Sequence, residues 1–205
     1  MNDSHSDIAP PNSESVFPNY FELLKLPVSF TIDQKQLVSH YQAIQMQVHP
    51  DHFATDSAQQ QRLALQYASQ VNEAYQTLLN PGKRAVYLLT LISGDEHFLN
   101  SVRVSPAFLQ EQMELHEALA LLPSIDDAQA RQLQYSSFID DLEKKRQGMI
   151  DTLTTLFSDT VYLFANNAQC GRPVDADIKE IAAVVQQYSY ITKLMAEAKK
   201  QANKI

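Results

Sequence analysis

The sequence predicts an all-α protein built from two helical domains. Only 4 glycines and 9 prolines occur among 205 residues, and long stretches contain neither, which favours helices. Apolar residues recur three and four positions apart in one segment after another, which is the spacing of a single helix face. A chain of this length can bury one large core or two small ones, and a linker-like segment near its middle favours two.

The N-terminal end is predicted to be a disordered tail followed by a short helix. Residues 1–17 are polar and contain two consecutive prolines, so they offer too little apolar surface to fold. Asn19, with Glu22 three places further on, has the pattern of a helix cap. We expect the short helix to run through the leucines up to Leu26 and to end at Pro27.

The next two helices are expected to form a hairpin. The second helix should begin at Thr31, where Gln34 completes another capping pattern. The third is expected from about Ser57 to Leu79, and a shorter fourth helix covers 83–92. The second and third helices each carry one apolar stripe, which predicts antiparallel packing. The two stripes are Leu37, Tyr41, Ile44 and Val48, and Leu63, Tyr67, Val71, Ala74 and Leu78.

The tripeptide His49-Pro50-Asp51 lies between these two helices. Proline has no backbone N–H and disfavours the helical conformation at the residue before it, so the second helix should stop near His49. His49 and Asp51 are then presented on a stiffened loop instead of a helix face. The loop is therefore the first candidate site.

Residues 95–105 read as a linker, and three more helical patterns follow it. The first starts at Ser105-Pro106, with proline at a favoured first helical position, and stops before Pro123. The second runs from about 126 to 164, and the third from about 175 to 202, with a loop at 166–175 between them. Three helices with two connections predict a small bundle over residues 106–205.

The His-Pro-Asp tripeptide between two antiparallel helices, with the string NEAYQTL at 72–78, resembles the J domain. That resemblance implies a co-chaperone that stimulates ATP hydrolysis by a seventy-kilodalton heat-shock chaperone. It places the J domain at 18–94 and implies a chaperone-binding set of His49, Pro50, Asp51, Lys35, His40 and His52. J domains usually carry arginines and lysines along the second helix, whereas this helix has one lysine and one histidine. Electrostatic steering toward the chaperone should therefore be weaker.

Further strings narrow the resemblance to one family. They are NYFELL at 19–24, HPDHFA at 49–54, RAVYLL at 84–89 and FLQEQMEL at 108–115. The chain has neither a glycine/phenylalanine-rich segment nor a cysteine-rich zinc region, both of which general J-domain chaperones often carry. A J domain joined to a three-helix C-terminal domain resembles the HscB type. That family delivers the iron–sulfur scaffold protein IscU to the specialised chaperone HscA.

The helix after the linker carries a second apolar strip beside its core face. Leu109, Met113 and Ala120 lie about a quarter-turn from the core positions, with Glu114 and Glu117 beyond them. A helix that faces one core needs one stripe, so the second strip has something else to cover. The resemblance implies scaffold binding by Leu109, Met113, Glu114, Glu117 and Tyr190. The alternative is that Leu109 and Met113 only widen the core face.

Composition and rival sites narrow the function further. A net charge of −8 argues against nucleic-acid or anionic-membrane binding, and no apolar run approaches the ~20 residues of a membrane span. The acidic N-terminus, which lacks arginine, is unlike a leader peptide, so a bacterial cytoplasmic protein is expected. No glycine-rich phosphate loop occurs, so we expect no bound ATP. The co-chaperone resemblance implies no enzymatic activity and no cofactor.

Two other interpretations stay open. His49 and His52 flank Asp51, and His40 lies one helix away, so a metal or hydrolytic site is the main rival, although a third convergent ligand is lacking. Cys170 has no base nearby and is expected to be an inert thiol. The other alternative is a J-domain co-chaperone or adaptor for a general chaperone with a different client. Stimulation of a chaperone ATPase separates a co-chaperone from a mere adaptor.

Overall fold

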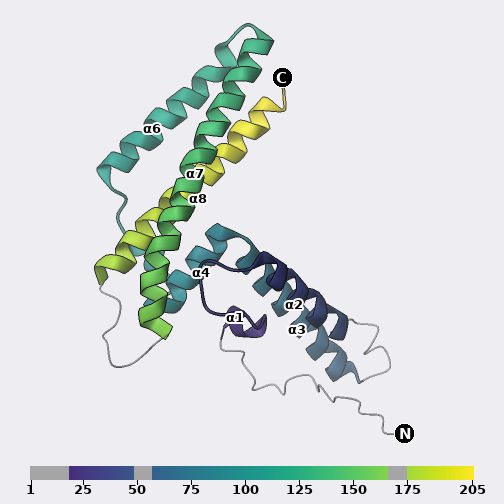
Figure 1. Ribbon diagram of the computed structural model, residues 1–205. Helices are drawn as coiled ribbons and strands as arrows, with labels where there is room; N and C mark the ends of the chain where they lie inside the picture. The colour runs from purple at the N-terminus through teal and green to yellow at the C-terminus, as the bar shows by residue number, and fades with distance from the viewer. Residues whose placement is uncertain (1–18, 49–56, 166–174) are drawn as a thin grey trace. The chain divides into compact units, whose positions relative to one another are not determined.

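The computed structural model describes residues 19–48, 57–165 and 175–205, with side chains to Ser158 and again from Ala176. These ranges contain helices and connecting turns and no strand, which confirms the predicted all-α class. The chain divides into two compact units, Met1–Asn80 and Pro81–Ile205 (Figure 1). No helix in the described ranges is long and apolar enough to cross a bilayer. The tail predicted at 1–17, the His-Pro-Asp loop and the 166–174 loop with Cys170 lie outside those ranges.

In the first unit, α1 (Tyr20–Leu23) begins as predicted and ends early. The Asn19 side chain accepts a hydrogen bond of 3.0 Å from the backbone N–H of Glu22. The expected extension to Leu26 is wrong, because Lys25 takes a left-handed conformation with φ of 54°. The N–H groups of Leu26 and Lys25 then bond to the carbonyls of Phe21 and Glu22. This pair of bonds is a Schellman closure, so Pro27 is not what ends the helix.

The hairpin of α2 (Gln34–Gln47) and α3 (Ala58–Leu79) forms as predicted, although the cap of α2 differs. Thr31 is not the cap. Asp33 is, and its carboxylate accepts hydrogen bonds from the backbone N–H groups of Lys35 and Gln36. An aspartate directly before the first helical residue reaches these groups more easily than a threonine two positions earlier. At α3, Ser57 and Gln60 form a reciprocal capping box that the sequence analysis did not identify.

A polar and aromatic contact joins α2 to α3. The rings of Tyr41 and Tyr75 stack with centroids 4.0 Å apart and planes at 17°. The Tyr41 hydroxyl and the Gln45 amide both donate to the side-chain oxygen of Asn72, at 2.6 and 2.9 Å. These contacts fix the two helices in register above a core that includes Leu37, Val71 and Leu78.

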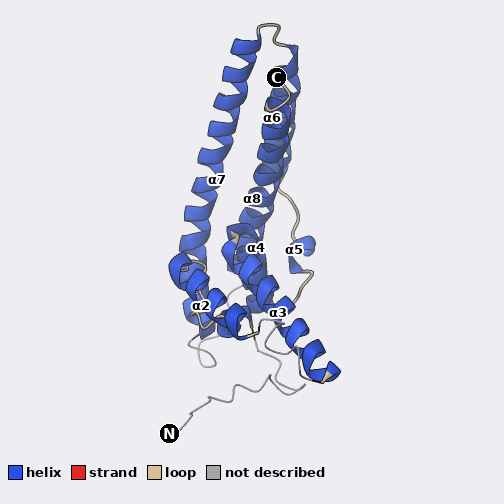
Figure 2. Ribbon diagram, turned by 90° about the vertical axis from the view of Figure 1, so that its right-hand side faces the viewer, coloured by secondary structure: helices blue, strands red, loops and turns tan. Residues whose placement is uncertain are grey.

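The second unit is built on two long helices, α7 (Ala128–Ala165) and α8 (Asp175–Ala202), which pack along each other (Figure 2). α6 (Pro106–Leu121) continues into a 3₁₀ turn, η2 (Leu122–Ser124), and packs on α8. The predicted three-helix arrangement of α6, α7 and α8 is therefore present. Its buried cluster joins all three helices: Leu119, Leu122, Tyr135, Leu142, Ile191, Leu194, Met195 and Ala198.

The helix α4 (Pro81–Ser93) also packs within the second unit, against α8 and α7. Its buried residues include Leu88 and Leu89, and Arg84 is only 6% exposed. Burial lowers the pKa of Arg84 to about 10, and Tyr188 on α8 favours its charged form. Arg84 is therefore still a cation at neutral pH. Packing divides the chain at Asn80, whereas the J domain was expected to run to residue 94, and that boundary stays a prediction.

The expected linker contains a short helix, α5 (Phe98–Ser101), which the sequence analysis missed. It packs against α4 and α8. The side-chain amide of Gln186 on α8 donates to the carbonyl oxygens of Leu99, at 2.8 Å, and Val102, at 3.0 Å. The segment leading into α6 is thus held on α8 by one side chain.

Candidate functional sites

The predicted chaperone-binding set is only partly described. His49, Pro50, Asp51 and His52 lie outside the described residues. Lys35 is exposed in the first turn of α2. The other exposed side chains of this helix are amides, the Ser39 hydroxyl and apolar groups, with Met46 73% exposed. The expected weakness of positive charge on α2 is therefore visible in its exposed face.

His40 has a partner inside its own unit. It is half-buried on α2, and its Nδ1 lies 2.8 Å from the backbone carbonyl oxygen of Leu24. A carbonyl only accepts hydrogen bonds, so Nδ1 carries the proton and donates it. His40 thus ties α2 to the residue that closes α1, and only its other ring nitrogen is left for a partner. Among the described residues, no group of three histidine, cysteine, aspartate or glutamate side chains has the arrangement of a metal site.

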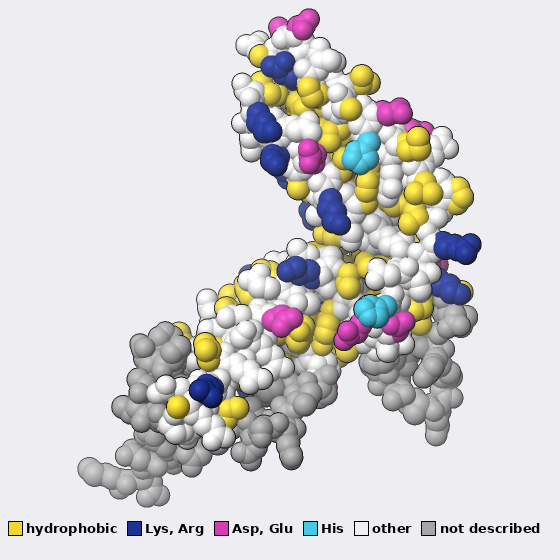
Figure 3. All heavy atoms as spheres, turned by 180° about the vertical axis from the view of Figure 1, so that it is seen from behind, with side chains coloured by type: hydrophobic (Ala, Val, Ile, Leu, Met, Phe, Trp, Pro, Cys, Tyr) yellow, Lys and Arg dark blue, Asp and Glu magenta, His cyan; other side chains and the backbone are white. Residues whose placement is uncertain are grey.

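The predicted scaffold-binding pair lies on an exposed ridge of α6. Leu109 is 49% exposed and Met113 is 65% exposed, whereas Phe108 and Leu119 on the same helix are 5% and 3% exposed. Core positions and ridge positions therefore occupy different faces, so the pair does not widen the core. On the face drawn in Figure 3, apolar side chains gather along α6 with acidic groups beside them.

One acidic side chain of α6 is in an ion pair, and two others are not. Glu111 forms an ion pair with Lys145 on α7. Glu114 accepts a hydrogen bond from Gln110 at 2.9 Å, and Glu117 is exposed. Among the described residues, no lysine or arginine forms an ion pair with Glu114 or Glu117. The ridge is thus bordered by two carboxylates whose charge is not neutralised within this part of the chain.

Tyr190 was predicted as a surface contact, and the structure gives it a second role. It is half-buried on α8, and its hydroxyl donates to the Gln112 carbonyl oxygen on α6 at 2.9 Å. Its ring lies edge-on to those of Phe108 and His116, with centroids at 5.6 and 5.8 Å. Burial, and then the nearby Glu111 charge, raises the pKa of Tyr190, so the hydroxyl stays a donor. Tyr190 braces α6 against α8 behind the ridge.

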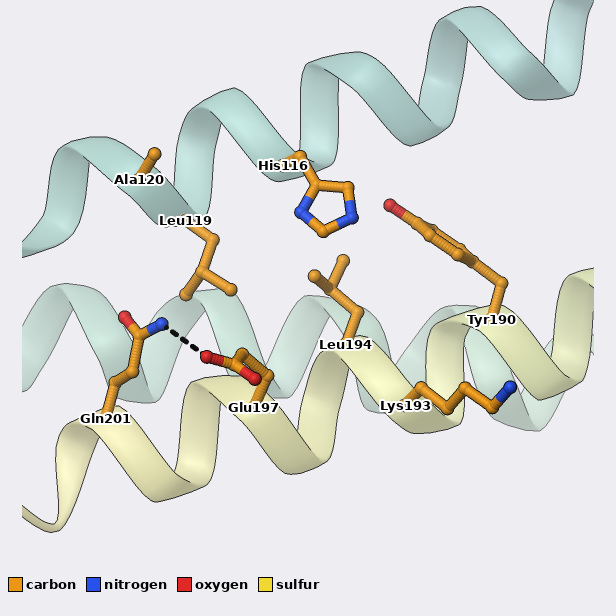
Figure 4. A pocket seen from close by; sticks show the side chains of 8 residues that line it. All are labelled: His116, Leu119, Ala120, Tyr190, Lys193, Leu194, Glu197 and Gln201. Atoms are coloured by element: carbon orange, nitrogen blue, oxygen red, sulfur yellow. Dashed lines mark hydrogen bonds between the residues drawn. The ribbon is translucent and has the colours of Figure 1, made fainter.

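A groove of about 370 Å³ opens between α6 and α8 beside this brace (Figure 4). Leu119 from α6 and Leu194 from α8 point toward each other in it, and His116 and Tyr190 lie at one end. The groove was not predicted from the sequence. A signal was present, because Leu109, Met113, His116 and Ala120 are spaced four, three and four apart and share one helix face.

Comparison with known proteins agrees with this architecture. The DnaJ domain family model matches residues 19–87, and the model described as HSCB C-terminal oligomerisation domain matches 104–199. The Co-chaperone protein HscB homolog of Burkholderia thailandensis is 40% identical over 143 residues, which cover 69% of this chain and 79% of that protein. The homolog from Vibrio cholerae is 39% identical over 126 residues, covering 62% and 74% of the two chains.

Solved structures show the same fold. Chaperone HscB from Vibrio cholerae superposes with a TM-score of 0.74 at 31% identity, covering 91% of this chain and 98% of that one. The human co-chaperone protein HscB superposes with a TM-score of 0.75 at 23% identity, covering 95% and 86%, and this likeness concerns the fold alone.

The helical hairpin, with its DnaJ match, followed by a separate α-helical unit defines a J-domain co-chaperone. Its class implies an Hsp70-type chaperone as partner. The chain belongs to the HscB family, the J-domain co-chaperones of iron–sulfur cluster assembly.

Proposed function

We propose that this protein stimulates the ATPase of an HscA/DnaK-type chaperone and delivers an IscU-type scaffold protein to it. The observation that carries the proposal is the exposed Leu109–Met113 ridge in the unit that matches the HscB C-terminal domain. The same chain carries a J domain. A client held on one unit is thereby brought to the chaperone that the other unit engages.

Exposure of the ridge supports the scaffold role on physical grounds. Large apolar side chains at one turn's spacing form a continuous strip that a partner groove can cover. Two carboxylates border the strip, so the complementary surface combines apolar contacts with basic side chains. Glu114, Glu117 and Tyr190 complete the proposed scaffold-binding set. Part of the role of Tyr190 is indirect, because its hydrogen bond to Gln112 holds α6 in place.

The J-domain role is assigned to the loop and to α2. His49, Pro50 and Asp51 form the proposed coupling motif, with Lys35, His40 and His52 as the cationic or protonatable groups around it. The weakly charged face of α2 favours a chaperone surface that reads shape and amide contacts more than charge. The proposed boundaries are a J domain at 18–94, a linker at 95–105 and the scaffold-binding domain at 106–205. The bacterial relatives support a site of action in the bacterial cytoplasm.

Two variants test the two halves of the proposal separately. Asp51→Asn removes a charge and keeps the side-chain shape, so chaperone ATPase stimulation should be lost while scaffold binding stays normal. Leu109→Ala/Met113→Ala should keep ATPase stimulation in the absence of scaffold and lose scaffold binding, which a titration with the scaffold measures. Truncating central apolar anchors costs ~1–3 kcal/mol each, so affinity should fall by tens of fold. Normal stimulation by Asp51→Asn would contradict the J-domain half.

A matched control exists within the same chain. Met46→Ala/Leu65→Ala removes the same two side-chain types at positions 73% and 66% exposed on α2 and α3. It should leave scaffold affinity unchanged. Thermal melting should be close to wild type for both double variants, because all four positions are exposed. Scaffold binding that survives in the Leu109→Ala/Met113→Ala protein would remove the ridge from the scaffold interface. A wild-type protein that does not bind the scaffold would favour the alternative, a co-chaperone for a general chaperone with a different client.

A further inference from the structure

The groove between α6 and α8 has an apolar floor and a nearly neutral rim. Leu119 and Leu194, 3% and 4% exposed, form the floor, and the small Ala120 leaves room above it. Its volume of about 370 Å³ lies within the ~300–1,000 Å³ range of pockets that hold small ligands. One large side chain therefore fits in it.

The rim gives a charged occupant no net attraction. Lys193 and Glu197 contribute one charge of each sign. Glu197 already accepts a hydrogen bond of 2.9 Å from Gln201, and Gln201 in turn accepts one of 3.0 Å from Tyr135. This chain of hydrogen bonds closes the end of the groove away from Tyr190. The two rim charges nearly cancel and the floor is apolar, so an ion entering the groove would lose hydration without a net attraction in return, and a neutral apolar group is favoured.

The groove is continuous with the ridge. His116 and Ala120, which line it, follow Leu109 and Met113 on the same face of α6, and Tyr190 lies where groove and ridge meet. Across α6 the order is thus groove, apolar ridge and acidic border. A partner that covers the ridge therefore has the groove on one side and the carboxylates on the other.

We infer that the groove receives one large neutral side chain of the scaffold partner, of the leucine, methionine or phenylalanine class. Basic residues of the same segment lie over Glu114 and Glu117. The inference rests on the proposed function. It adds an anchor pocket to the exposed ridge, and it makes Ala120 a residue whose small size sets the room available to the partner. Well-packed pockets near the centre of an interface hold the anchors that dominate its binding energy.

The test fills the groove without touching the ridge. Ala120→Phe places a ring in the space above Leu119 and Leu194, at an exposed helical position that tolerates substitution. Titration with an IscU-type scaffold protein should then show at least a tenfold loss of affinity, with melting close to wild type. Ala196→Phe is the control, because it adds the same ring at an exposed position of α8 that does not line the groove. Wild-type affinity of Ala120→Phe, or a gain, would overturn the inference.

A second measurement needs no substitution. In full-length protein with labelled methyl groups, scaffold addition should shift the resonances of Leu119 and Leu194 and leave those of Leu153 unchanged. Unshifted Leu119 and Leu194 at saturating scaffold would also overturn the inference. A change in the protein's own sedimentation on Ala120→Phe would assign the groove to a second copy instead. If the wild type does not bind the scaffold at all, the proposed function has failed. If the wild type binds and only Leu109→Ala/Met113→Ala loses affinity, the groove inference alone has failed.

Discussion

The Tyr190 hydroxyl donates a 2.9 Å hydrogen bond to the backbone carbonyl of Gln112, joining residues 78 positions apart on α8 and α6. The bond lies directly behind the exposed ridge. It fixes the position of α6 at the turn that separates Leu109 from Met113. The position of the ridge therefore depends on a hydrogen bond made by a half-buried side chain of another helix.

Two substitutions of Tyr190 distinguish the contribution of its hydroxyl from that of its ring. Tyr190→Phe should lower the free energy of unfolding by about 0.5–1.5 kcal/mol and leave scaffold affinity within a few fold of wild type. Tyr190→Ala should weaken both, because the edge-on contacts with Phe108 and His116 go as well. Chemical denaturation and scaffold titration measure the two effects. A scaffold affinity of Tyr190→Phe as poor as that of Leu109→Ala/Met113→Ala would mean that the hydroxyl touches the partner.

Replacing His40 should affect stability. His40→Phe keeps a ring but removes the hydrogen-bond donor to the Leu24 carbonyl. Leu24 is fully buried, so water cannot replace that donor. An unpaired buried carbonyl costs about 1–3 kcal/mol, so unfolding in urea should shift to lower concentration. His40→Asn, whose amide nitrogen can replace Nδ1 as donor, should recover much of the loss. ATPase stimulation by folded His40→Phe protein then tests its proposed chaperone contact, and equal stability of the Phe variant and wild type would contradict the structural role.

The ion pair of Glu143 and Arg146 on α7 predicts a pH dependence. The hydrogen bond from Arg146 lowers the pKa of Glu143 below its usual ~4.3. A lowered carboxyl pKa stabilises the folded state above the unfolded-state pKa, and the effect disappears as pH falls through the folded-state pKa. Glu143→Gln should therefore melt about 1–3 °C below wild type at pH 7, the range of a partly exposed pair. The difference in melting temperature should shrink as pH falls below the usual carboxyl range of ~4.3 and vanish below the lowered folded-state pKa, and a difference that does not shrink would exclude this cause.

The packing of α4 predicts where the second unit can be cut. A fragment beginning at Pro81 should melt at a higher temperature than one beginning at Asp95. The shorter fragment lacks Leu88 and Leu89, which are buried in α4, and burial of each such side chain contributes about 1.5–3 kcal/mol. Calorimetry of the two fragments measures the difference. Equal melting temperatures would mean that α4 does not stabilise the second unit, and would support a J-domain boundary at residue 94.

Helix periodicity predicted the elements well, and local hydrogen bonding decided where they differ from expectation. The apolar residues of α2 and α3 recur at three and four positions, so they share one face only in a helix. Two such helices joined by a short loop bury these faces against each other, so their pairing was predictable. Thr31 and Asp33 are both good cap residues, and only coordinates show which carboxyl or hydroxyl oxygen reaches the free N–H groups. The end of α1 depends on a left-handed lysine, which no composition rule predicts.

The candidate site was predictable in part for the same reason. The separation of Leu109 and Met113 from the core face follows from 3.6 residues per turn, and their exposure agrees with it. The Tyr190–Gln112 bond, the Gln186 contacts with Leu99 and Val102, and the groove each join residues more than 70 positions apart. Such contacts depend on how α5 and α6 pack against α8, which a single sequence does not specify.

The arrangement across α6 divides the kinetics of the proposed complex between two sets of side chains. Glu114 and Glu117 act at a distance, so they set how fast a basic partner arrives, and added salt should slow that arrival. Leu109, Met113 and the groove act only on contact, so they set how long the partner stays. Sequence changes at the acidic border can therefore tune the rate of loading without altering the lifetime of the loaded state. A delivery protein that must collect a client quickly and keep it until the chaperone arrives has use for that independence.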